Sequence, residues 1–154
     1  MCLNKEVWLE DVYPLIEQQL CAGGSASFTI NGTSMLPFLR SKKDSVKIAN
    51  PNEAIRKVAP KKYDIIFYRR ANGDFVLHRI VKVENGYYIC RGDNQVDNEQ
   101  VDKQSVIAVA TEYCKNGVWK PMGNKGQRIY SFFWVNTMII RKIKRKIFSI
   151  FKKK

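Results

Sequence analysis

The chain has 154 residues, a hydrophobic content of 45% and a net charge of +13. These values fit a single globular domain with a modest core, and they exclude a disordered chain, which carries far fewer apolar residues. The charge is unevenly placed, because residues 141–154 carry eight cations and no acid and leave the rest of the chain at +5. The domain itself is therefore only mildly basic.

Residues 1–24 predict an amphipathic helix. Acidic residues interrupt every apolar run in this segment, so neither a signal peptide nor an N-terminal transmembrane anchor is expected. Four scattered cysteines without a CxxC pair, together with a single histidine, argue against structural zinc and favour reduced thiols in the cytoplasm. The side chains available for a core face are Val7, Leu9, Val12, Leu15, Ile16 and Leu20.

Residues 25–122 predict a mainly β domain with many short turns. The turn at 71–74 joins two apolar stretches into a predicted β-hairpin, and a second pair is joined at Asn116-Gly117. Residues 51–60 indicate a loop or a short helix. The predicted strands occupy residues 25–30, 45–49, 63–70, 75–83, 87–91, 105–113 and 117–122.

The stretch "NGTSMLPFLR" places Ser34 on a predicted bend. Gly32 before it and Pro37 after it both break regular structure. The apolar side chains around them are expected to pin this bend to the core. These side chains are Met35, Leu36, Phe38 and Leu39.

Further along, the only histidine and two aspartates provide partners for a serine. His78 stands in "VLHRIV", where strand alternation puts it on one partly buried face with Val76 and Ile80. Asp93 and Asp97 follow a strand end in "RGDNQVDNE". A serine nucleophile needs a nearby base, and a histidine base gains from a carboxylate that fixes its tautomer. Each feature alone is more often structural, whereas the three in this order favour a serine hydrolase.

These stretches resemble the boxes of type I signal peptidases. "GTSMLP" is similar to their Ser-Met-x-Pro box, "YDIIFYRR…VLHRIV" to their Gly-Asp-Ile-Val strand with the base-bearing strand, and "RGDNQVD" to their Gly-Asp-Asn box. The resemblance runs from about Ser25 to Ala110. "His-Arg-Ile" at 78–80 stands where bacterial members typically have a lysine, and it resembles the Ser/His branch of the endoplasmic-reticulum and sporulation-type enzymes.

The resemblance implies a signal-peptidase-like β-fold catalytic core over residues 25–122, flanked by the two terminal helices. It makes Ser34 the nucleophile, His78 the general base and the Ser34 backbone N–H an oxyanion donor. We expect Asp97 to orient the base, with Asp93 as the alternative. No cofactor is expected, and the substrate is a peptide or precursor protein.

The chain departs from the family pattern at several points, and two other functions stay open. Gly32 stands where many relatives have a serine that assists the oxyanion, and Tyr63 replaces a glycine. One alternative is a LexA-like self-cleaving regulator. Such regulators have a lysine base and a DNA-binding domain, and in this chain only Ala22-Gly23 offers a cut site. The other is a non-catalytic membrane-associated module that retains the fold.

Residues 127–154 predict a basic amphipathic helix. The apolar stretch 129–140 is shorter than the ~20 residues needed to span a bilayer. Cations alternate at helical spacing with Ile139, Ile143, Ile147 and Ile150, which favours the surface of an anionic membrane. The alternative is a helix packed on the domain with a solvated charged face, and nucleic acid is less favoured because no binding fold accompanies the charge. We expect a cytoplasmic, peripheral protein whose cleavage activity survives removal of everything after Gly126.

Overall fold

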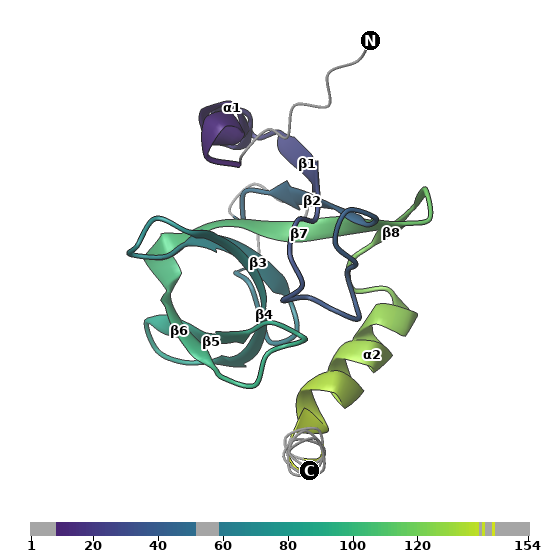
Figure 1. Ribbon diagram of the computed structural model, residues 1–154. Helices are drawn as coiled ribbons and strands as arrows, with labels where there is room; N and C mark the ends of the chain where they lie inside the picture. The colour runs from purple at the N-terminus through teal and green to yellow at the C-terminus, as the bar shows by residue number, and fades with distance from the viewer. Residues whose placement is uncertain (1–8, 52–58, 139, 141–142, 144–154) are drawn as a thin grey trace, which may run out of the picture.

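The computed structural model describes residues 9–51, 59–138, 140 and 143 (Figure 1). In this part of the chain eight strands form one antiparallel sheet, with a helix before it and a helix after it, so the predicted mainly β fold with two terminal helices is confirmed. The elements are α1 (Leu9–Cys21), β1 (Ser25–Thr29), β2 (Ser45–Ala49), β3 (Ile65–Arg69), β4 (Phe75–Val83), β5 (Tyr87–Arg91), β6 (Glu99–Asp102), β7 (Val106–Lys115), β8 (Val118–Pro121) and α2 (Lys125–Asn136).

The sheet runs in the order β1-β2-β7-β3-β4-β5-β6, and β8 pairs with β7 beside this path. Figure 1 shows β3 to β6 curling into a roll, while β1 and β2 extend from its upper side. The long strand β7 joins the two parts, because it pairs with β2, with β3 and with β8. One apolar core lies between β1, β2, β7 and α1, and a second, smaller one lies around Ile66, Tyr68, Ile80 and Tyr88 inside the roll.

The predicted turns are found where the sequence placed them. β3 and β4 form the expected hairpin across residues 70–74, and β7 and β8 pair across Asn116-Gly117. Helix α1 ends before Gly23, whose φ of 75° suits a glycine at a helix end. Strand β6 was not predicted, and most of the predicted loop or short helix at 51–60 lies outside the described residues.

Helix α2 begins two residues before the predicted start. The side chain of Asn124 caps it by accepting a hydrogen bond from the Gln127 backbone N–H. Of the predicted apolar positions, Ile143 is described and exposed, whereas Ile139, Ile147 and Ile150 lie outside the described residues. In the described part of the chain, no helix has the length and apolar character to cross a membrane.

Candidate active site

Ser34 lies on a tight bend between β1 and β2, as predicted. Three of the four flanking apolar side chains, Met35, Phe38 and Leu39, are buried in the core. The far end of the bend is closed by an ion pair between Arg40 and the fully buried Asp44, at 2.7 Å. The buried apolar side chains and the Arg40–Asp44 ion pair thus fix this irregular backbone segment, which places the Ser34 hydroxyl in a defined position.

The loop after β5 holds the bend from the other side. The Asn94 backbone N–H donates a 2.7 Å hydrogen bond to the Ser34 carbonyl oxygen. Gly92 packs so closely that a Cβ atom there would lie 2.7 Å from the same oxygen. The "RGDN" segment therefore positions Ser34 through backbone contacts, and a glycine at 92 is required by this close approach.

His78 lies on β4 on the same face as Val76 and Ile80, and it is 2% exposed. Its Nδ1 atom lies 3.1 Å from the hydroxyl of Tyr68 and 3.6 Å from Glu99 Oε2. Tyr68 reaches the ring because it lies on β3, where it pairs with Val76 and so stands diagonally across from His78.

The hydrogen bonds around this ring determine its tautomer. Tyr68 donates its only hydroxyl proton to Glu99 Oε2, at 2.7 Å. Glu99 in turn accepts two 2.7 Å hydrogen bonds from Arg70. The oxygen of Tyr68 can then only accept from His78, so Nδ1 carries the hydrogen and Nε2 is left as the basic nitrogen.

Burial and these contacts also set the charges. Burial lowers the pKa of His78 to about 4, partly opposed by the charge of Glu99. Hydrogen bonds from Arg70 hold the pKa of Glu99 below its ordinary value, so it is ionised at neutral pH. Burial and the Glu99 hydrogen bond raise the pKa of Tyr68, which keeps its proton. At neutral pH the imidazole is therefore an uncharged proton acceptor.

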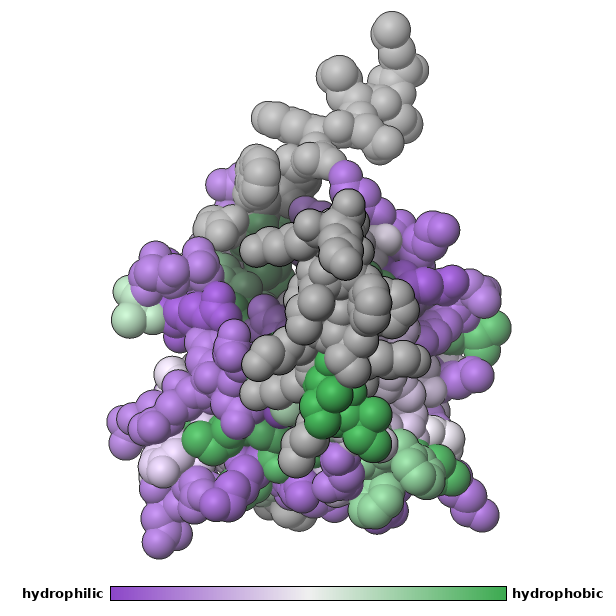
Figure 2. Space-filling view, turned by 60° about the horizontal axis from the view of Figure 1, so that its bottom comes forward, coloured by the Kyte–Doolittle hydropathy of each residue, from purple (hydrophilic) through white to green (hydrophobic). Residues whose placement is uncertain are grey.

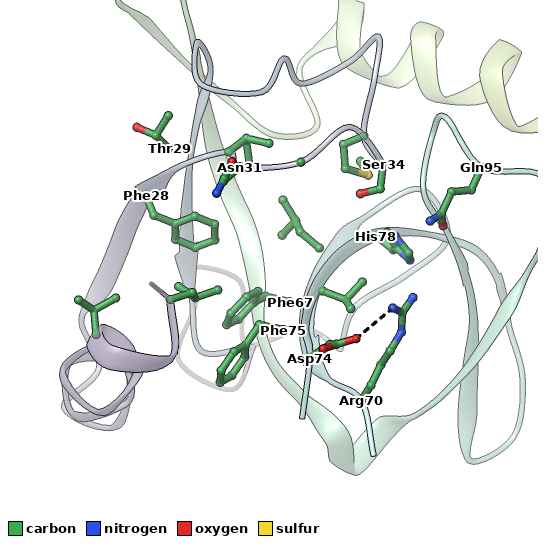
Figure 3. A pocket seen from close by; sticks show the side chains of 17 residues that line it. Phe28, Thr29, Asn31, Ser34, Phe67, Arg70, Asp74, Phe75, His78 and Gln95 are labelled. Atoms are coloured by element: carbon green, nitrogen blue, oxygen red, sulfur yellow. Dashed lines mark ion pairs between the residues drawn. The ribbon is translucent and has the colours of Figure 1, made fainter. Parts of the chain in front are cut away.

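Ser34 and His78 line one cavity of about 680 Å³. Figure 3 shows their labelled side chains with Gln95 at one end of it, while aromatic rings gather at the other. Gln95 was not predicted from the sequence, and its side-chain oxygen accepts a 3.4 Å hydrogen bond from the Gly92 N–H. The apolar part of the lining consists of Leu9, Val12, Phe28, Ile30, Met35, Phe67, Phe75, Val76 and Leu77.

The carboxylate beside the imidazole is Glu99, which corrects the expectation of Asp97 or Asp93. Asp97 is exposed on the loop before β6. Asp93 is 4% exposed and forms a paired ion contact with Arg79 at 2.7 and 2.8 Å. Glu99 was not predicted because strand β6 was not predicted. The sequence signal that points to Glu99 is its position two residues before Val101, which is buried in the roll.

In the described part of the chain, no three acidic, histidine or cysteine side chains come together in a way that could hold a metal ion. Cys21, Cys90 and Cys114 are free thiols. No family model, curated protein or solved structure matches the chain. The likeness to signal peptidases thus stands on the sequence boxes alone.

Proposed function

We propose that the protein is a serine endopeptidase of the signal-peptidase-like type, with Ser34 as nucleophile and His78 as general base. One observation carries the proposal. Two residues 44 positions apart line the same cavity, and the imidazole is held with its hydrogen on Nδ1 and its basic Nε2 available. A buried, neutral histidine that lines the same cavity as a fixed serine can act as the base that activates its hydroxyl.

The reaction follows from these groups. Nε2 of His78 removes the proton of the Ser34 hydroxyl as its oxygen attacks the carbonyl carbon of the peptide bond. The resulting oxyanion is stabilised by the Ser34 backbone N–H. The imidazolium then gives its proton to the departing amine, and a water molecule, activated by the same nitrogen, releases the acyl group from Ser34. Glu99, through Tyr68, stabilises the imidazolium and keeps the ring in place.

The shape of the cavity supports an extended peptide as substrate. Thr29, Ile30 and Asn31 line one wall, and residues 74–78 line another. Within the described chain β1 pairs only with β2, and the β4–β5 pairing begins at Arg79, so both walls offer backbone groups to an added strand. The aromatic end provides space for an apolar side chain away from the scissile bond.

Self-cleavage of the LexA-like kind is not favoured. The Ala22-Gly23 bond follows α1, where the Gly23 and Gly24 backbone N–H groups are hydrogen-bonded to the helix. Five residues of β1 then separate it from the bend, about 17 Å at strand spacing. A cut at this bond would require β1 to leave the sheet. Proposed substrates are therefore other peptides or precursor proteins, met by a peripheral protein in the cytoplasm.

The test is to incubate purified protein with a diverse peptide pool and map cuts by mass spectrometry, with a serine-directed acylating probe in parallel. We expect Ser34→Ala and His78→Ala each to lower kcat/KM by at least ~10³-fold, and the double variant to lose little more, because the two act as one unit. Ser34→Ala should also lose probe labelling. A folded wild-type protein that neither cuts peptides nor reacts with the probe is a non-catalytic module instead.

A further inference from the structure

Helix α2 and the described residues after it expose a row of large apolar side chains. Ile129, Phe132 and Phe133 are 59%, 53% and 60% exposed, and Ile140 and Ile143 are 65% and 55% exposed. Ile129, Phe132 and Phe133 are three and four residues apart, which places them along one side of α2, and Ile140 and Ile143 follow after this helix ends at Asn136. Figure 2, in which the lower part of Figure 1 comes forward, shows hydrophobic side chains gathered between hydrophilic ones on this face. We refer to these five residues as the apolar stripe.

The other side of α2 packs against the domain. Ser131 is fully buried and accepts a 2.7 Å hydrogen bond from Arg79, and Tyr130 donates to Asp93. Trp134 stacks on Tyr130 with ring centroids 5.4 Å apart and donates its indole N–H to the Asp93 carbonyl oxygen. Turning the apolar stripe inward would break all of these contacts. The part of the stripe on α2 is therefore a fixed outer face of the protein.

The charge around the stripe indicates what covers it. The sequence has no acidic residue after Glu112, and residues 141–154 carry eight cations. Lys125 and Arg128 are exposed at the start of the helix. A second copy docked through this face would bring two such cationic segments together, which opposes self-association. An anionic lipid surface satisfies both features, because it accepts apolar side chains at the acyl boundary and cations at the headgroups.

We propose that α2 is a membrane-docking surface that lies in the plane of an anionic bilayer and inserts the apolar stripe. This extends the peripheral location proposed above, and lipid binding itself does not require peptidase activity. Since the inner side of α2 contacts Asp93, whose loop holds the Ser34 carbonyl through Asn94, the docked helix is also a direct support of the candidate active site.

The experiment is flotation of full-length Ser34→Ala protein with phosphatidylcholine vesicles that contain or lack phosphatidylglycerol. Using the inactive variant separates lipid binding from catalysis. We expect binding to the anionic vesicles that weakens with salt, and at least a tenfold loss of affinity in Phe132→Ser/Phe133→Ser. The matched control is Leu15→Ser, which should bind as the parent does. Leu15 was expected on the core face but is 65% exposed on α1, which lies far from α2 in Figure 1.

Melting temperature is measured for each variant, and Ile129→Ser provides a second, milder change on the same face. Unchanged vesicle binding by both stripe variants overturns the proposal, because the cationic segment alone then accounts for binding. It is also overturned if the parent ignores anionic vesicles, or if it forms a dimer in ultracentrifugation that the stripe variants abolish. Binding to RNA but not to vesicles overturns it as well.

Discussion

His78 is neutral because it is buried, and it owes its tautomer to neighbours on the same sheet face. Tyr68 reaches it from β3 and Glu99 from β6, and Arg70 fixes the carboxylate of Glu99. The carboxylate of Glu99 lies 3.6 Å from Nδ1 of His78, and the tyrosine hydroxyl is hydrogen-bonded to both. A catalytic serine site normally relies on a carboxylate in direct contact with the base, so in the proposed site the tyrosine hydroxyl would take part of that role.

The first prediction at this scale concerns pH. The folded pKa of His78 is about 4, below the unfolded value of about 6.5, so the base is neutral over the whole range above pH 5. Activity should therefore rise through pH 4 and reach its plateau by about pH 6. A rise centred near pH 6.5 in a kcat/KM profile contradicts the buried, neutral imidazole, and a rise only above pH 9 indicates a lysine base.

The same shift predicts a change in stability. As pH falls below 6.5 the unfolded chain binds a proton that the folded chain does not bind until pH 4, so the free energy of unfolding declines across that window, by up to about 3 kcal/mol. The contribution is complete above pH 6.5. Urea unfolding at several pH values measures this decline. In His78→Gln the free energy of unfolding should depend less steeply on pH between pH 6.5 and 4 than it does in the wild type.

A further prediction distinguishes the carboxylates. Glu99→Gln should lower kcat/KM by ~10²- to 10⁴-fold, because the imidazolium loses its counter-charge. It should also move the acid limb of the pH profile to lower pH, since the Glu99 charge raises the pKa of His78. Asp97→Asn is the matched control and should act as wild type, because Asp97 is exposed on the loop. The reverse pattern, with both variants folded, would restore Asp97 as the orienting residue.

At the scale of elements, the loop after β5 and the bend that carries Ser34 behave as one unit. Gly92→Ala should displace the Ser34 carbonyl, because a Cβ atom would lie 2.7 Å from it, and we expect a loss of about 1–3 kcal/mol in stability with at least a tenfold loss of activity. Activity and thermal unfolding report the two effects.

Gly126→Ala is the control for this change. It places a methyl group in ordinary contact, 3.5 Å from the side chain of Asn124, in the first turn of α2, and alanine favours a helix. We expect it to leave activity unchanged and to retain or improve stability. If Gly92→Ala behaves in the same way as Gly126→Ala, the close approach at Ser34 does not constrain the site.

The strands show how far sequence alone reaches. Those with apolar alternation or clear turns, such as β3 and β4 around residues 70–74, are found where predicted. Strand β6 (Glu99–Asp102) has only one buried apolar residue, Val101, so no local pattern marks it as a strand. Its pairing with β5 is what carries Glu99 to His78, and local periodicity does not predict which strands pair.

Single residues escape prediction for related reasons. Tyr63 has a φ of 81°, a backbone conformation that favours glycine, and the sequence hints at it only through the glycine that the resembling family has at this position. Its carbonyl oxygen accepts a hydrogen bond from Arg79. By contrast, strand alternation predicted that His78 is partly buried, and it is in fact almost completely buried. The position of Ser34 on a bend was predicted from Gly32 and Pro37.

For the whole molecule, α2 is part of the domain and not a detachable tail, which revises the expectation for truncation after Gly126. Such a truncation removes Tyr130, Ser131 and Trp134, and we expect it to cost at least ~3 kcal/mol and to abolish activity, because buried hydrogen bonds to Arg79 and Asp93 are lost. Truncation after Ile140 keeps these contacts and should leave melting temperature and peptide cleavage unchanged. Equal activity of both truncated forms contradicts this role of α2.

The buried pair of Arg79 and Asp93 has a consequence for how related chains can diverge. Arg79 is fully buried and donates hydrogen bonds to the Tyr63 carbonyl oxygen just before β3, to the carboxylate of Asp93 and to Ser131 of α2. Replacing one partner leaves an uncompensated charge in the interior, a loss of about 3–5 kcal/mol, whereas a joint apolar replacement is tolerated. Positions 79, 93 and 131 should therefore change together among relatives, or not at all.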